Sequence, residues 1–237
     1  MAAVMSTPLA APLPMSAYPR QLALALDHAE SYAREDFLSG ASNEAALALI
    51  ESWPDWPAQA VALVGPEGSG KTHLATIWAA TAGARVISGR HLGETDLPGA
   101  LATGALVVED AAAVTDERAL FHLINLAREE GAFLLFTARS APTLWPASLP
   151  DLVSRLRALP VVALDQPDDG LLRGVLLKVA TDRQLSLDDS VVRYLLTRIE
   201  RSLAAARAAV IALDKEALRQ GRAPSRALAA EMFRDSP

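Results

Sequence analysis

Cysteine is absent from the 237 residues of the sequence. Its absence excludes disulfide bonds and the metal or iron–sulfur sites that depend on cysteine thiolates. It also fits a reducing compartment, so we expect a cytoplasmic protein. Long apolar runs are missing too, since none approaches the roughly 18 residues of a membrane-spanning helix. Residues 1–20 lack a basic start followed by an apolar block, and we expect a disordered tail there rather than a secretory signal.

An excess of positive charge is also missing. The chain has 22 Lys and Arg against 28 Asp and Glu, which gives a net charge of −6. Proteins that bind duplex DNA usually present a broad basic surface, because they neutralise backbone phosphates. We therefore expect binding to bare duplex DNA to be weak and non-specific. The apolar share of 51% allows a sizeable core, and the length allows an α/β domain with a small appendage, or two modest domains.

The most informative segment that is present is Gly-Pro-Glu-Gly-Ser-Gly-Lys-Thr at residues 65–72, which satisfies the pattern G-x-x-x-x-G-K-[ST]. The apolar run before it, residues 60–64, predicts a buried strand, and residues 73–79 predict a helix. A glycine-rich turn between a strand and a helix can curl so that its backbone N–H groups point at phosphate oxygens. The positive end of the helix faces the same anion. This context predicts a nucleotide-binding loop.

Two side chains of this loop carry further expected chemistry. Lys71 would reach the outer phosphates, and the hydroxyl of Thr72 would help to hold Mg²⁺. The residues of the loop expected to contact the nucleotide are Gly65, Gly68, Ser69, Gly70, Lys71 and Thr72.

Strand and helix patterns alternate through the part of the chain that contains this loop. Continuous apolar runs interleaved with helices are typical of a parallel sheet that is covered on both faces. We therefore expect an α/β domain at residues 27–165 with a five-stranded parallel sheet. Its strands are predicted at residues 60–64, 84–88, 105–109, 132–137 and 159–164.

The pattern becomes wholly helical after residue 165, and we expect a small all-helical lid domain at residues 166–237. Four helices are predicted there: at 169–184, after a capping box at 186–189, at 201–219, and from Ser225 to near residue 234. Gly221 is the expected C-cap of the third.

Two of the predicted strands end in polar side chains. The strand at 105–109 delivers Glu109 and Asp110, and in a doubly wound sheet its carboxyl end lies beside the phosphate loop. Both acids are candidate catalytic residues, and Glu109 is a candidate Mg²⁺ ligand; an ordinary strand with solvated acids is the alternative. Thr137 ends the strand at 132–137, where a side chain is placed to sense the γ-phosphate or its attacking water, although many strands end in threonine.

These segments, in this order, resemble an AAA+ ATPase and, within that class, the DnaA/Hda family of replication proteins. Residues 37–43, Phe-Leu-Ser-Gly-Ala-Ser-Asn, are similar to the family's F-x-x-G-x-x-N segment, which lies against the adenine. Arg201-Ser202-Leu203 is similar to the R-x-L opening of the family's sensor 2 helix. The resemblance covers roughly residues 21–235. It implies ADP or ATP as the cofactor, with Phe37, Thr137 and Arg201 among its contacts.

Arg155 has two interpretations. By itself, an arginine just before the last strand predicts a surface or helix-end cation. In this order along the chain, Ser154-Arg155-Leu156 is similar to the arginine finger of the family, a planar cation aimed at the phosphates of a neighbouring subunit. The resemblance implies that Arg155 is catalytic toward a partner's nucleotide.

Two features favour the Hda branch of the family over the initiator DnaA. The chain ends after the lid domain, where the initiator continues into a helix-turn-helix domain. Residues 21–26, Gln-Leu-Ala-Leu-Ala-Leu, place three leucines on one face when extended. They resemble the peptide with which Hda docks on the β sliding clamp, and they imply clamp contacts by Gln21, Leu22, Leu24 and Leu26. An edge strand or an ordinary tail is the alternative.

The resemblance implies a negative regulator of replication initiation with two partners, DnaA and the DNA polymerase III β clamp. DNA would be met only through the clamp, at the replisome. Two departures from the initiator's pattern, Glu109 for an aspartate and Arg139 for an acid, predict weak intrinsic ATP hydrolysis. The alternatives are a stand-alone DnaA-family ATPase that assembles on single-stranded DNA or loads a helicase, and a partner-binding adaptor with an inactive ATPase fold. The oligomeric state stays open, with a homodimer as one alternative.

Overall fold

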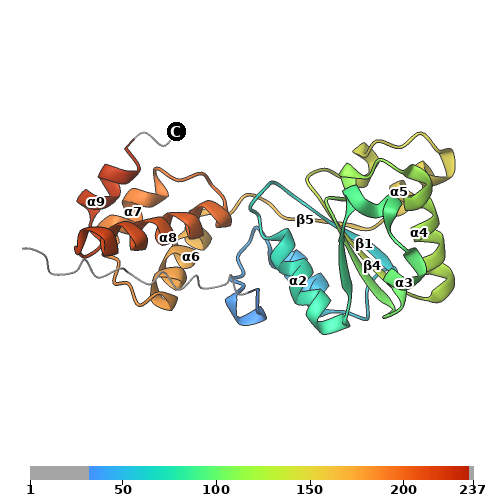
Figure 1. Ribbon diagram of the computed structural model, residues 1–237, viewed down its shortest axis with the longest axis horizontal. Coiled ribbons are helices and arrows are strands. Elements are labelled where there is room, and N and C mark those ends of the chain that lie inside the picture. The colour runs from blue at the N-terminus through green and yellow to red at the C-terminus, as the bar shows by residue number, and fades with distance from the viewer. Residues whose placement is uncertain (1–31, 235–237) are drawn as a thin grey trace, which may run out of the picture.

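The computed structural model describes residues 32–234, so the predicted clamp peptide at residues 21–26 lies outside the described residues. Figure 1 shows a sheet flanked by helices in one half of the molecule and a bundle of helices in the other. The short 3-10 helix η1 (Arg34–Asp36) lies between the two halves.

The sheet consists of five parallel strands in the order β2-β3-β4-β1-β5. The strands are β1 (Ala60–Val64), β2 (Arg85–Ser88), β3 (Ala105–Glu109), β4 (Phe133–Ala138) and β5 (Val161–Ala163). The predicted five-stranded parallel sheet is therefore confirmed, and each predicted strand lies within two residues of the observed bounds. Since β1 lies between β4 and β5, the loop after β1 leaves the sheet beside the carboxyl ends of these two strands, and β3 lies one strand further, beyond β4.

Helices cover both faces of this sheet. They are α1 (Glu44–Glu51), α2 (Lys71–Ala82), α3 (Leu97–Leu101), α4 (Glu117–Glu130) and α5 (Pro150–Ala158). Alternate residues of β3 point to opposite faces: Leu106 and Val108 pack with α3, α4 and α5, whereas Ala105 and Val107 pack with α1 and α2. Both faces of β3 are thus apolar and buried, which explains why its sequence is a continuous apolar run.

The helical domain has a core of its own. Its helices are α6 (Asp169–Asp182), α7 (Asp189–Leu196), α8 (Leu203–Gln220) and α9 (Arg226–Met232). The predicted helix ends at Gly221 and Ser225 are confirmed: Gly221 has φ +62°, and the Oγ of Ser225 accepts the N–H of Leu228 at 3.2 Å. The predicted capping box was wrong. α7 starts at Asp189 with Asp188 at the cap position, and no side chain there accepts a capping hydrogen bond.

Across residues 32–234, none of the helices combines the length and the apolar character that a membrane crossing requires.

Candidate nucleotide-binding site

A cavity of about 340 Å³ lies where the phosphate loop, η1 and the helical domain meet. This volume falls within the usual range of small-molecule sites. The core contributes Tyr32, Asp36, Phe37, Leu38, Glu67, Gly68, Gly70, Lys71, Thr72 and His73, and the helical domain contributes Val175, Leu203, Ala204 and Arg207. Several residues that the sequence predicted as nucleotide contacts are therefore brought together here, namely Phe37, Gly68, Gly70, Lys71 and Thr72.

The phosphate loop requires glycine at two positions. Gly68 has φ +71° and Gly70 has φ +103°, a backbone region that residues with a Cβ rarely adopt. A Cβ at Gly68 would also lie 2.6 Å from the Cβ of Ser202. At the same point, the backbone N–H of Leu203 donates to the carbonyl of Gly68 at 2.9 Å. Helix α8 of the helical domain therefore begins directly on the phosphate loop.

The side chains of the phosphate loop are suited to bind an anion. Nζ of Lys71 donates to the carbonyls of Gly65 at 2.8 Å and Pro66 at 2.7 Å, which holds the ammonium over the loop. Burial lowers the pKa of Lys71, and the positive charge of Arg139 acts in the same direction. The hydroxyl of Ser69 is buried and has no hydrogen-bond partner within the described chain. A phosphate group offers acceptor oxygens for both side chains and for the first-turn N–H groups of α2.

The two acids lie at the carboxyl end of β3, as predicted, but the chain turns sharply between them. Asp110 is exposed with φ +51°, and its N–H donates to the Oγ1 of Thr137 at 3.3 Å. Oε1 of Glu109 is buried without a hydrogen-bond partner among the described residues, which suits a carboxylate that faces a cation. Thr137 is 3% exposed and pairs with Leu63 of β1. It thus joins neighbouring strands, and it does not line the cavity.

Residues 37–43 form another wall of the site. Phe37 is 5% exposed, and its ring meets the ring of His73 edge to face, with 5.2 Å between the centroids. Asn43 organises the following turn: its Oδ1 accepts the N–H of Gly40 at 2.9 Å, and its Nδ2 donates to the carbonyl of Leu38 at 3.1 Å. The glycine and asparagine of the F-x-x-G-x-x-N pattern are thus linked by a hydrogen bond, which gives the spacing a physical reason.

His73 is a site residue that sequence reasoning missed. It follows Thr72 in the first turn of α2, and its ring also packs edge to face on Tyr32, at 5.3 Å between centroids. Nε2 of His73 lies 3.0 Å from the carbonyl of Ala33, and since a carbonyl only accepts, this nitrogen carries the proton. Burial lowers the pKa of His73. The position directly after the phosphate loop was the one signal in the sequence.

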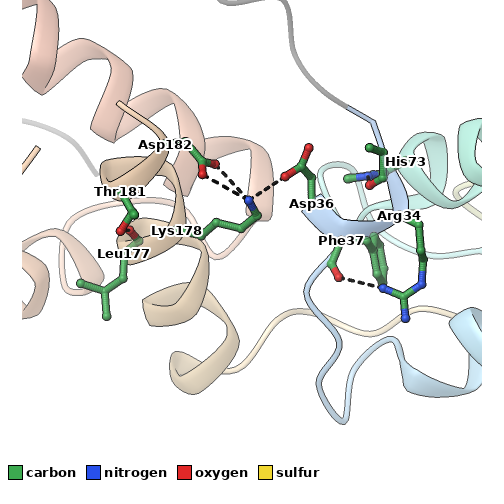
Figure 2. A network of polar contacts seen from close by, with 9 residues as sticks. Arg34, Asp36, Phe37, His73, Leu177, Lys178, Thr181 and Asp182 are labelled. Carbon is green, nitrogen blue, oxygen red and sulfur yellow. Dashed lines mark hydrogen bonds and ion pairs between the residues drawn. The ribbon is translucent and has the colours of Figure 1, made fainter. Parts of the chain in front are cut away.

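An ion pair joins the helical domain to η1 at the edge of the cavity. Nζ of Lys178 on α6 lies 2.6 Å from Oδ1 of Asp36 and 3.1 Å from Oδ2 of Asp182. Figure 2 shows the ammonium between these two carboxylates. The hydrogen bond to Asp36 raises the pKa of Lys178. No sequence pattern connects residues so far apart along the chain, so only the fold reveals this contact.

Two predicted arginines lie away from the cavity lining. Arg201 pairs through Nη1 with Asp169 at 2.8 Å and donates through Nη2 to the carbonyl of Pro167 at 3.3 Å. Arg155 lies on α5 and is half-buried, with its guanidinium carbon 5.3 Å from the ring centroid of Phe121 on α4. The lid arginine that does line the cavity is Arg207, which no motif indicated.

Comparisons with known proteins agree with this geometry. Residues 169–224 match the family model of the Hda lid domain. Domain III of the replication initiation protein DnaA from Thermotoga maritima superposes with a TM-score of 0.71 at 20% identity, covering 86% of this chain and 96% of that one. AMPPCP-bound DnaA from Aquifex aeolicus superposes with a TM-score of 0.64 at 18% identity, covering 79% of this chain and 66% of that one. The RuvB branch migration motor of Thermotoga maritima superposes with a TM-score of 0.69 at 18% identity, covering 86% of this chain and 72% of that one. No curated protein matches the chain.

The fold is that of an AAA+ protein: a phosphate loop on a five-stranded parallel sheet, followed by a helical lid. Within this class, residues 169–224 match the lid domain of Hda, and the fold of the chain is similar to that of DnaA domain III. The resemblance to Hda, a DnaA-related AAA+ protein, is therefore confirmed by the lid and by the fold.

Proposed function

We propose that this protein is a DnaA-related regulator of replication initiation that binds an adenine nucleotide and promotes hydrolysis of ATP on DnaA. The observation that carries the proposal is the Hda-type lid, whose helix α8 begins on the phosphate loop and closes a cavity of nucleotide size. A ligand bound between the two domains stabilises their arrangement by mass action, by about 2.7 kcal/mol at a hundredfold excess over its Kd.

The nucleotide would be held mainly by the phosphate loop. Lys71 and the N–H groups at the start of α2 face its phosphates, and Phe37 lies on the adenine side. Because no group of three or more His, Asp or Glu side chains within residues 32–234 could hold a metal ion, Mg²⁺ would share its coordination between Thr72, Glu109 and the phosphates. The ion would neutralise phosphate charge. With ADP retained in this site, the protein acts on its partner's nucleotide rather than on its own.

Arg155 would serve that partner. Its place on α5, outside the lining of the chain's own cavity, supports a role toward a neighbouring molecule. An arginine supplied in trans stabilises the charge that develops on the transferred phosphoryl group, and such residues contribute on the order of 10³–10⁵ in rate. Asp110, Thr137 and Arg201 complete the proposed machinery around the chain's own nucleotide.

The segment 21–26 would tether the protein to the β clamp, which places it in the cytoplasm at the replisome. Its leucines are the expected anchors, and DNA would be approached through the clamp alone. This arrangement would confine hydrolysis of DnaA-bound ATP to times when clamps are loaded on DNA.

The decisive experiment measures hydrolysis of ATP on DnaA with and without this protein and clamp-loaded DNA. Stimulation that requires both supports the proposal. Assembly on single-stranded DNA with clamp-independent hydrolysis would favour the stand-alone ATPase instead. Stimulation by a protein that binds no ADP or ATP would favour an adaptor with an inactive ATPase fold.

A further inference from the structure

The cavity between the core and the lid has two kinds of lining. At the phosphate loop, the ammonium of Lys71 and the first-turn N–H groups of α2 offer positive charge and donors. Elsewhere the lining is apolar and includes Phe37, Leu38 and Val175. A nucleotide has the same asymmetry, with anionic phosphates at one end and an uncharged aromatic base at the other. The base is therefore expected against the apolar lining.

On the core side, the apolar lining is rigid around Phe37. This side chain is buried, and its ring meets that of His73 edge to face, with 5.2 Å between the centroids. The imidazole is itself fixed, because its Nε2 lies 3.0 Å from the carbonyl of Ala33. A base that rests one face on this wall has a second face, and any contact with that face has to come from the lid.

Helix α8 is the part of the lid that supplies side chains opposite this wall. Leu203, Ala204 and Arg207 line the cavity. The first two lie at the phosphate loop: the N–H of Leu203 donates to the carbonyl of Gly68, and a Cβ at Gly68 would lie 3.4 Å from that of Ala204. Arg207 lies one turn later, about 5 Å further along the axis. It is thus the residue with which α8 continues the lining beyond the loop.

The charge of Arg207 is felt on the side of Phe37 rather than at the phosphates. Burial is the main cause of the lowered pKa of His73, and the positive charge of Arg207 lowers that pKa further. The pKa of Lys71 is lowered by burial and by Arg139, and within residues 32–234 Arg207 is not among the charges that act on it. Arg207 is half-buried, and no hydrogen bond or ion pair within the same residues holds its guanidinium.

We propose that Arg207 is a base-binding residue, whose planar guanidinium covers the face of the nucleotide base that the Phe37 wall leaves open. This inference rests on the nucleotide site of the proposed function and deepens it. A guanidinium stacks on an aromatic system while its N–H groups stay partly in water, which suits a half-buried arginine without a partner. The lid would then close in response to the base, whereas Lys71 and the loop hold the phosphates.

The test is calorimetric titration of the full chain with ADP, adenosine and inorganic pyrophosphate. Arg207→Gln should weaken ADP and adenosine by the same factor, about threefold to tenfold, the usual effect of a cation on a π system. Its affinity for pyrophosphate should stay that of wild type. Arg207→Phe keeps a flat group without the charge and should restore most of the loss, whereas Arg207→Lys keeps the charge without the flat group and should restore less. Arg219→Gln, an exposed arginine of the same helix, is the matched control and should change no affinity.

Rescue by lysine but not by phenylalanine overturns the assignment, because it places the charge of Arg207 at the phosphates. A loss for ADP with unchanged adenosine does the same, and so does an unchanged ADP affinity in Arg207→Gln. Thermal unfolding without ligand shows that each variant is folded. If the affinities change as expected but hydrolysis on DnaA is not stimulated, the inference stands and the regulatory function fails. If wild type binds neither ADP nor adenosine, the base site and the nucleotide site of the proposed function both fail.

Discussion

Lys178 of α6 and Asp36 of η1 form an ion pair of 2.6 Å that ties the lid to the segment carrying Phe37. Both side chains are largely buried, at 25% and 19% exposure, so water and salt screen this pair less than a surface pair. Figure 2 shows the pair spanning from α6 to η1, and Asp36 is part of the cavity lining. It is thus placed to control how easily the lid moves away from a bound nucleotide.

Lys178→Met should speed the release of ADP by about fivefold, the effect of a contact worth on the order of 1 kcal/mol. Stopped-flow displacement of a fluorescent ADP analogue measures this rate. The double variant Asp36→Asn with Lys178→Met should release ADP no faster than the faster of the two single variants, because both changes remove the same contact. Arg193→Met, which breaks an exposed pair within the lid, is the matched control and should change nothing.

Lys71→Ala should abolish measurable ADP binding. It removes the ammonium that the loop carbonyls hold over the phosphate position, and within residues 32–165 no other Lys or Arg lines the cavity. Calorimetry with ADP measures the loss, and thermal unfolding without nucleotide shows whether the variant is folded. Retained micromolar binding would falsify the phosphate-loop assignment.

Arg155→Ala should separate two activities. ADP affinity and clamp binding should be nearly unchanged, because Arg155 does not line the cavity and packs on Phe121 at the surface of α4. Stimulation of hydrolysis on DnaA should fall by at least about a thousandfold. Arg157→Ala, in the same helix and exposed, is the control and should keep stimulation. Loss of ADP binding in Arg155→Ala, or full stimulation, would rule out a finger acting in trans.

Replacing Gln21, Leu22 and Leu26 by alanine should remove binding to the clamp and leave ADP affinity intact. The three anchors supply most of the apolar area that such a peptide buries, at roughly 25 cal/mol per Å². Pull-down on immobilised clamp measures the effect. Unchanged capture would mean that the tether lies elsewhere.

Glu117 should make the stability of α5, the helix that carries Arg155, depend on pH in the acidic range. Its carboxylate accepts the N–H groups of Ser148 at 2.7 Å and Leu149 at 2.9 Å, just before α5 begins. These hydrogen bonds, that from Leu149 first, lower the pKa of Glu117 below its ordinary 4.5. The contribution to stability is therefore complete above pH 4.5 and is lost as the pH falls through the lowered pKa of the folded state.

Glu117→Gln should accordingly lower the Tm at neutral pH, and its difference in Tm from wild type should shrink as the pH falls below 4.5 and through the lowered pKa of Glu117. Thermal unfolding followed by circular dichroism across this range measures both. Glu130→Gln, at the other end of α4, is the matched control. A difference in Tm between Glu117→Gln and wild type that did not change with pH would argue against an ionised Glu117 as the anchor of α5.

The sheet and the phosphate loop could be predicted from sequence because their signals are local. A buried parallel strand such as β3 is apolar on both faces, and the loop after β1 requires glycine where φ is positive. The contacts between core and lid could not be predicted in this way. Packing of α6 and α8 against the core brings Arg207, Lys178 and His73 to the cavity or its edge. No spacing of residues in the sequence predicts that packing. The sequence gives no signal for the turn at Asp110 either, because that turn is held by a hydrogen bond to Thr137 on another strand.

The contact between Leu203 and Gly68 makes α8 a lever with its fulcrum on the phosphate loop. The helix has 18 residues, so its far end lies about 27 Å from that fulcrum at 1.5 Å per residue. A tilt of about 10° at the loop would move the far end by about 5 Å over this length. If the loss of one phosphate group at Gly68 tilted α8 in this way, the displacement would be largest near Gly221, where a partner that never touches the nucleotide would detect it.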